Sequence, residues 1–124
     1  MKYLLLAYED TRWCDGMSVG ERLAFENACL ANDDMLRKSG RLLAVEGVQS
    51  SSAIATVQVQ NGKVSIIDGP FVEARQQLVR LFFINARDLN EAIHVALSMP
   101  HARIGSIEVR PMIQLAQTRP EEKP

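Results

Sequence analysis

The chain has 124 residues, of which 47% are apolar and 23% are charged, and its formal net charge is −1. This length fits one domain with a substantial core and is too short for two. The near-neutral charge argues against nucleic-acid binding, which would need a basic face, and no apolar segment approaches the roughly 20 residues of a membrane span.

The chain begins with an apolar segment, residues 2–8, which predicts a strand. The segment is too short for a signal peptide, and charged residues follow it directly with no small-residue cleavage site. We therefore expect a cytoplasmic protein. In that reducing compartment Cys14 and Cys29 are expected to be free thiols, because their spacing matches neither a zinc site nor a redox motif.

A helix is predicted from Ser18 to about residue 38. Ser18 and Glu21 form a capping-box pattern, and Gly40 stands where a left-handed residue often ends a helix. Leu23 and Leu30 lie on the side expected to face outward, either as ordinary exposed leucines or as a subunit or loop contact. The helical period of 100° per residue places the following residues on the expected core face: Ala24, Phe25, Ala28, Ala31, Asn32, Met35 and Leu36.

A second strand is predicted over residues 41–45, and a hairpin follows it. Residues 54–60 and 63–67 flank Asn61-Gly62, the pair preferred in a two-residue type I′ turn. Alternation of valine and glutamine on the first arm predicts one buried face and one hydrated face.

The second half of the chain predicts a strand over residues 81–85, a helix and a last strand over residues 104–110. Asp88 and Glu91 match the start of the helix, and Pro100 prevents its continuation. Its expected core face consists of Leu89, Ala92, Ile93, Ala96 and Leu97.

This order of elements predicts an α+β fold of ferredoxin-like β-α-β-β-α-β type with an added central hairpin. We expect residues 1–115 to form the domain and residues 116–124 to be a disordered polar tail. Two helices cover only one face of such a sheet. Because the other face is also apolar, the sequence predicts a homodimer in which a second subunit covers it.

The segment over residues 64–80 is the main candidate for function. It reads as a strand that stops at Asp68-Gly69-Pro70, where the backbone turns sharply and a carboxylate is presented. Asp68 is either an acid, base or ligand anchor beside a pocket, or a turn residue that bonds backbone amides. Both interpretations remain open.

Three further charged residues belong to the predicted ligand site. Arg75 either binds an anionic ligand or forms a structural ion pair with Asp68, Glu73 or Glu46. Glu73 is expected to be a hydrated neighbour. Glu46 ends a predicted strand, where it is placed to share a pocket with Arg75.

The residues D-G-P-F-V-E-A-R-Q-Q-L closely resemble the D-G-P-F-A-E-T-K-E-Q-L signature of the DGPF branch of the YCII-related family. The resemblance continues in M-K-Y-L-L-L-A-Y, S-G-R-L-L-A-V-E-G-V-Q, D-L-N-E-A-I and G-S-I-E-V-R-P, in the same order along the chain. It implies a ferredoxin-like domain that dimerises as a dimeric α+β barrel. Proteins of this branch are often associated with extracytoplasmic-function sigma factors, so the resemblance also implies, as a second alternative, a role as a protein-binding accessory to such a factor.

The resemblance also indicates a departure. Other YCII-related proteins carry a histidine about eleven residues before the glycine that ends the first helix, paired with an aspartate in a catalytic dyad. Counting back from Gly40 leads to Cys29, so the dyad does not carry over, and Cys29 is expected to be a buried, inert thiol. His94 and His101 are expected at the surface.

No phosphate-binding loop, nucleophile elbow or metal-spaced cluster is present in the sequence, so we expect neither a cofactor nor a bound metal. Our main hypothesis is a domain that binds a small polar or anionic molecule near the Asp68-Gly69-Pro70-Phe71 turn. The alternative is a cofactor-free lyase, isomerase or oxygenase-like enzyme that uses Asp68 as acid or base. That alternative rests on fold analogy alone.

Overall fold

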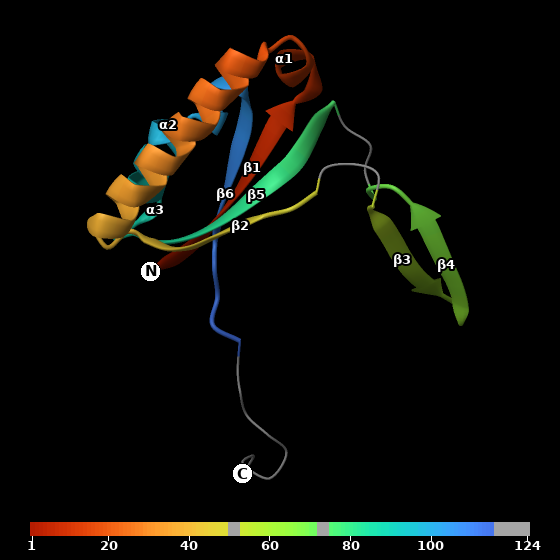
Figure 1. The fold of residues 1–124 in the computed structure, drawn as a ribbon. Coiled ribbons are helices and arrows are strands. Elements are labelled where there is room, and N and C mark those ends of the chain that lie inside the picture. Colours follow the sequence, from red (N-terminus) through yellow and green to blue (C-terminus); the bar gives the residue numbers. More distant parts are fainter. Residues whose placement is uncertain (50–52, 72–74, 116–124) are drawn as a thin grey trace, which may run out of the picture.

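The computed structural model describes residues 1–49, 53–71 and 75–115 (Figure 1). Its strands are β1 (Lys2–Asp10), β2 (Leu42–Gly47), β3 (Ala55–Gln60), β4 (Lys63–Asp68), β5 (Gln76–Asn85) and β6 (Gly105–Pro111). Its helices are α1 (Thr11–Asp15), α2 (Val19–Lys38), α3 (Leu89–Ser98) and α4 (His101–Ile104). The predicted tail over residues 116–124 and the predicted site residue Glu73 lie outside the described residues.

Four strands form one antiparallel sheet in the order β2-β5-β1-β6, and β3 and β4 pair only with each other in a separate hairpin. Both long helices lie on the same face of the four-stranded sheet (Figure 1). This arrangement confirms the predicted α+β, ferredoxin-like fold with a hairpin inserted between β2 and β5.

The core lies between this sheet and the helices. Alternate residues of β1 point into it, and Tyr3, Leu5 and Ala7 are at most 2% exposed. Phe82 and Ile84 of β5 join them from the neighbouring strand.

The predicted turn and cap residues adopt the expected backbone conformations. Asn61 and Gly62 have φ of 53° and 77°, which confirms the type I′ hairpin. Ser18 and Glu21 bond reciprocally in a capping box, and Gly40 has φ of 78° just after the end of α2. Each of these signals depends on the conformational preference or capping bond of one or two neighbouring residues, so it can be identified from the sequence.

The predicted core face of α2 is only partly right. Leu36 is buried and Phe25 is half-buried, as predicted, but Cys29 and Asp33 are buried instead of the other predicted residues. The exposed members of the predicted face are Ala24, Ala28, Ala31 and Met35. The helix is turned so that charged side chains point toward the sheet, where they pair with charged residues of the strands. A search for apolar periodicity cannot detect such a face. Leu23 and Leu30 are exposed, as expected for the outer side.

The core face of α3 is also only partly as predicted. Ala92, Val95 and Ala96 are buried, whereas Leu89, Ile93 and Leu97 are 40–59% exposed. The helix packs beside α4 and β6, the strand at one edge of the sheet. Because α3 lies at the edge of the sheet, a narrower stripe of its surface is buried than the apolar pattern predicts.

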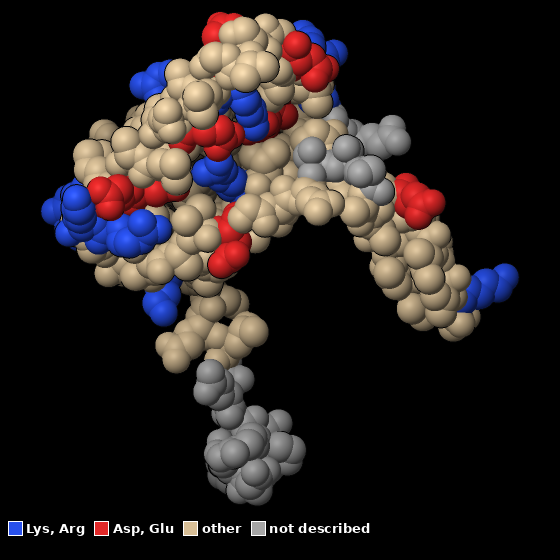
Figure 2. Space-filling model, viewed as in Figure 1, with Lys and Arg blue, Asp and Glu red and all other residues tan. Residues whose placement is uncertain are grey.

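The second face of the sheet, which we call the open face, has no helix over it in the described part of the chain. Its central residues are half-buried and mostly apolar: Leu4, Leu6, Tyr8, Leu78, Leu81 and Phe83. A hollow separates this part of the molecule from the hairpin in Figure 2, and charged side chains gather over the helix-bearing part rather than over the hairpin.

Candidate functional site

The predicted turn lies at the base of the hairpin. Asp68 ends β4 and is exposed, and Gly69 has φ of 111°, a value that favours glycine. The amide of Gly69 donates to the carbonyl of Ile54 at 2.7 Å, and its carbonyl accepts from the hydroxyl of Thr56 at 2.8 Å. The Gly69 amide is therefore satisfied by backbone and not by the carboxylate of Asp68.

The other predicted site residues have their own positions in the fold. The carbonyl of Arg75 accepts from the amide of Thr11 at 3.4 Å, so Arg75 is placed at the end of β1. There it assists Arg12, the main cause, in lowering the pKa of Asp10. Glu46 is exposed on β2, opposite Leu81 on the open face. Within the described residues, no ion pair joins Asp68, Arg75 and Glu46.

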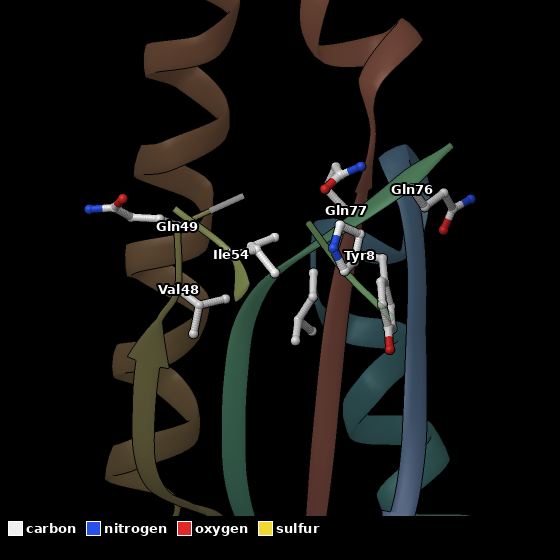
Figure 3. A pocket seen from close by; sticks show the side chains of 8 residues that line it. Tyr8, Val48, Gln49, Ile54, Gln76 and Gln77 are labelled. Atoms are coloured by element: carbon white, nitrogen blue, oxygen red, sulfur yellow. The ribbon is translucent and has the colours of Figure 1, made fainter. Parts of the chain in front are cut away.

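A cavity of about 510 Å³ lies between the end of the four-stranded sheet and the base of the hairpin (Figure 3). Tyr8 and Leu78 are cross-strand partners in β1 and β5, and they continue the open face into the cavity. The described lining residues are Tyr8, Val48, Gln49, Ile54, Pro70, Gln76, Gln77 and Leu78. Its volume is within the usual range for small-molecule sites.

The described lining of this cavity carries apolar groups, amides and one phenol, and no ionised side chain. The Tyr8 hydroxyl donates to Glu108 at 3.2 Å, and burial together with that carboxylate raises the pKa of Tyr8. Such a lining suits a neutral molecule that is partly apolar and bonds to amides. Sequence reasoning placed a pocket near Pro70 but did not identify Tyr8 or Leu78 as its walls.

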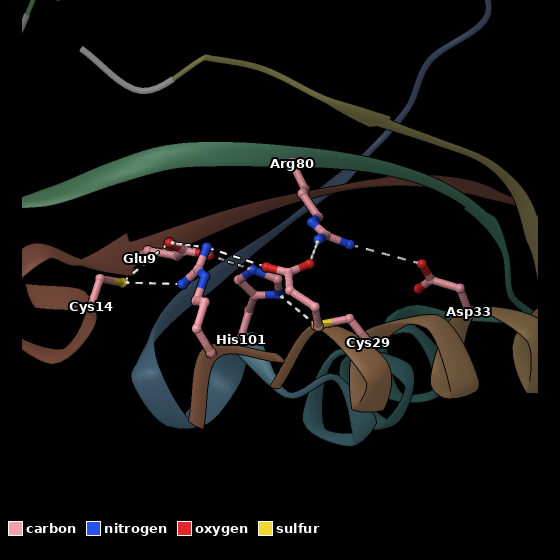
Figure 4. Close-up of polar contacts among 8 residues, drawn as sticks. Glu9, Cys14, Cys29, Asp33, Arg80 and His101 are labelled. Carbon is pink, nitrogen blue, oxygen red and sulfur yellow. Dashed lines mark hydrogen bonds and ion pairs between the residues drawn. The ribbon is translucent and has the colours of Figure 1, made fainter. Parts of the chain in front are cut away.

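A second group of functional side chains lies on the opposite face of the sheet, under α2 (Figure 4). We call Glu9, Cys14, Arg22, Cys29 and His101 the Glu9 cluster. One carboxylate oxygen of Glu9 lies 3.1 Å from Nε2 of His101, and the other accepts from the Cys14 thiol at 3.1 Å. Arg22 donates to both oxygens at 3.2 Å, and Cys29 Sγ lies 3.8 Å from Nδ1 of His101.

A chain of ion pairs extends the Glu9 cluster along α2. Arg22 also contacts Glu26 at 3.2 Å, and Arg80 of β5 contacts the same carboxylate at 2.6 Å. Arg80 also lies 4.0 Å from Asp33, about two turns further along the helix. Charged groups on one helix face are thus matched by charged groups on two strands, which fixes how α2 sits on the sheet.

The electrostatics of the Glu9 cluster favour a structural role. The hydrogen bond to His101, assisted by Cys14 and Arg22, lowers the pKa of Glu9 to about 2 despite burial. Burial raises the pKa of Cys29 to about 11, and burial and Glu9 raise the pKa of Cys14. Both thiols therefore stay protonated at neutral pH, a state that is poorly nucleophilic.

The surface position predicted for His101 is wrong, whereas His94 is exposed as predicted. His101 is 1% exposed because Pro100 begins a short helix, α4, that turns the imidazole inward against Phe25 and Glu9. The prediction that Cys29 is buried is confirmed. One signal for the cluster was present in the sequence: Glu9 continues the buried alternation of β1.

In residues 1–49, 53–71 and 75–115, no three His, Cys, Asp or Glu side chains gather in a way that would hold a metal ion. None of the helices in this part of the chain combines the length and hydropathy that a membrane span requires.

Comparison with known proteins gave two matches. The model of the YCII-related domain matches residues 1–116. An uncharacterized protein of Rhizobium meliloti (strain 1021) is 31% identical over 126 residues, an alignment that covers 100% of this chain and 99% of that protein. Each match spans the helices, the sheet and the hairpin together.

Proposed function

The chain belongs to the YCII-related domain family, and on that premise we propose that it is a DGPF-type member that binds a small molecule in the cavity beside the Asp68-Gly69-Pro70-Phe71 turn. The supporting observation is the position of the cavity. Pro70 of the turn forms one wall, and Tyr8 and Leu78 of the sheet form another.

The lining residues favour a neutral ligand over an anionic one. The described walls hold amides and apolar groups and no ionised side chain. The exposed charged residues near the lining residues in the chain are of both signs: Arg75 precedes Gln76, and Glu46 and Asp68 each lie two residues from a lining residue. A wall without a fixed charge favours a neutral ligand. We propose a partly apolar molecule with an amide, alcohol or similar hydrogen-bonding group.

We propose binding rather than turnover. Acid–base catalysts usually lie in clefts that exclude water, whereas Asp68 is exposed at a strand end. The buried groups with catalytic chemistry, Glu9 and His101, are already bonded to each other on the far side of the sheet. Neither observation favours the enzyme alternative.

We also propose that the domain acts as a homodimer. The open face presents Leu4, Leu6, Leu81 and Phe83, none of which is fully buried by the described part of the chain. An apolar patch of this kind on a small domain marks an interaction surface. The cavity is continuous with this face, so dimerisation and binding involve neighbouring residues.

A thermal-shift screen of neutral amides, alcohols and lactones tests the binding proposal, with Gln76→Ala as the pocket variant and Gln58→Ala as its matched control. Gln76 lines the cavity, whereas Gln58 lies on the hairpin away from it. A true ligand stabilises the wild type and Gln58→Ala equally, and binds Gln76→Ala about tenfold more weakly, roughly 1.4 kcal/mol. Equal shifts for all three proteins, or no shift for the wild type, would contradict the proposal. Asp68→Ala should retain most of the shift.

A further inference from the structure

The hairpin of β3 and β4 has one wholly apolar side. Val57 is paired with Ile66 and Val59 with Val64, so these four β-branched side chains share one side of the two strands. They are 63–69% exposed. The opposite side holds Gln58, Ser65 and other residues of mixed polarity. We call the four-residue surface the arm face.

An isolated two-stranded hairpin is marginally stable in water, because it has no layer against which to bury its side chains. β3 and β4 pair only with each other, and the hairpin stands away from the four-stranded sheet (Figure 1). A hairpin that exposes four β-branched residues therefore requires a cover that the described part of the chain does not supply.

The open face is the second uncovered apolar surface of the same molecule. Its cross-strand pairs are Leu4 with Phe83 and Leu6 with Leu81, and the next pair, Tyr8 with Leu78, forms part of the cavity. Figure 2 shows a hollow between the helix-bearing part of the molecule and the hairpin, and the four arm-face residues are 63–69% exposed, so the two apolar surfaces do not meet within one chain.

The dimensions of the two surfaces favour a second copy of this chain as the cover. Six residues per strand give the arm a length of about 20 Å, and four strands spaced about 4.8 Å apart span about 14 Å, so the arm is long enough to cross the sheet. Because one chain carries both uncovered surfaces, a second copy supplies a cover for each of them.

We infer that two copies exchange arms: the arm face of each subunit lies on the open face of the other. Under twofold symmetry both pairs of apolar surfaces are covered at once, and no surface is left to recruit a third copy. The partner's arm then also forms a wall of the cavity, because Tyr8 and Leu78 continue the face that it covers. This inference rests on the proposed homodimer and adds to it the element that completes the site.

Cross-linking between differently labelled chains tests the exchange. In a Cys14→Ser background, chains carrying Val59→Cys and Leu6→Cys are mixed and oxidised mildly, and the only remaining native thiol, Cys29, is buried. We expect a disulfide-linked dimer from this mixture and at least a tenfold lower yield when Gln58→Cys replaces Val59→Cys. Gln58 neighbours Val59 on the same strand but points to the other side. Equal yields, or a disulfide formed within one chain when both cysteines are on it, would overturn the inference.

Light scattering on purified protein gives an independent readout. Ile66→Lys, on the arm face, is expected to raise the dimer Kd at least tenfold, whereas Ser65→Lys on the opposite side leaves it unchanged. Both positions are exposed, so neither change disturbs the core. A dimer that survives Ile66→Lys refutes arm exchange. Ligand binding is scored separately, so a failed ligand screen together with correct cross-links would count only against the proposed function.

Discussion

Replacing Glu9 by Gln removes one negative charge from a buried pair and leaves the size of the side chain almost unchanged. Glu9 is 8% exposed and lies 3.1 Å from His101. Its pKa falls from 4.5 to about 2, mainly through that hydrogen bond. At about 1.4 kcal/mol per pH unit, this fall corresponds to roughly 3 kcal/mol in favour of the ionised folded form. Loss of one partner of a buried ion pair typically costs about 3–5 kcal/mol, so the two magnitudes agree.

The effect should depend on pH with a definite sign. Because the pKa of Glu9 is lower in the folded than in the unfolded protein, its stabilisation is complete above about pH 4.5 and is lost as the pH falls toward 2. Linkage therefore predicts that Glu9→Gln lowers the free energy of unfolding by about 3 kcal/mol at pH 7 and by about 1.4 kcal/mol at pH 3.

Urea denaturation at both pH values measures this difference. Asp34→Asn is the matched control, because Asp34 forms an exposed i,i+4 pair with Lys38 and should change stability by less than about 0.5 kcal/mol. A difference between wild type and Glu9→Gln that is the same at pH 7 and pH 3 would refute the assignment of this energy to the Glu9 carboxylate. So would a change below about 1 kcal/mol at pH 7.

Two further predictions concern the strands and the thiols. An ideal Cβ at Gly105 would collide with the carbonyl of Tyr8 across the β1–β6 pairing, whereas at Gly47 it meets only ordinary contacts. Gly105→Ala should therefore lower the free energy of unfolding by about 2 kcal/mol or more, and Gly47→Ala should leave it nearly unchanged, as measured by thermal or urea unfolding. With Ellman's reagent at pH 8, Cys14 should react slowly and Cys29 only after unfolding, because burial raises the pKa of both thiols and Cys29 is 3% exposed. Rapid loss of the Cys29 thiol in the folded Cys14→Ser variant would contradict this.

The features that the sequence predicts well are those set by local backbone chemistry. The Asn61-Gly62 turn, the Ser18 capping box and Gly40 each impose a conformation that few other residues favour, so the elements around them are identified correctly. Alternation in β1 similarly predicts a strand. The order of these elements then leaves the ferredoxin-like plan as the natural arrangement.

The features that the sequence did not predict depend on contacts between distant segments. Glu9 and His101 are separated by 92 residues, and each is an ordinary polar residue until the other lies beside it. Arg80 reaches Glu26 on α2 only because β5 lies next to β1 in the sheet. Hydrophobic periodicity placed the alanines of α2 inward, since it takes no account of polar groups that neutralise each other. The candidate site also depends on contacts between distant segments, because its walls come from three separate parts of the chain.

A β-bulge in β5 determines which of its side chains face the cavity and which face α2. In β1, Tyr8 points to the cavity and the adjacent Glu9 points to the buried cluster, as alternation requires. In β5 the register shifts here: Ala7 is opposite Arg80 and Tyr8 is opposite Leu78, so Val79 is the additional residue. Without it, Leu78 would lie opposite Glu9 on the helix side, and the cavity would lose an apolar wall. One extra residue thus keeps Arg80 paired under α2 and Leu78 beside the cavity, which makes the bulge part of the site as well as of the fold.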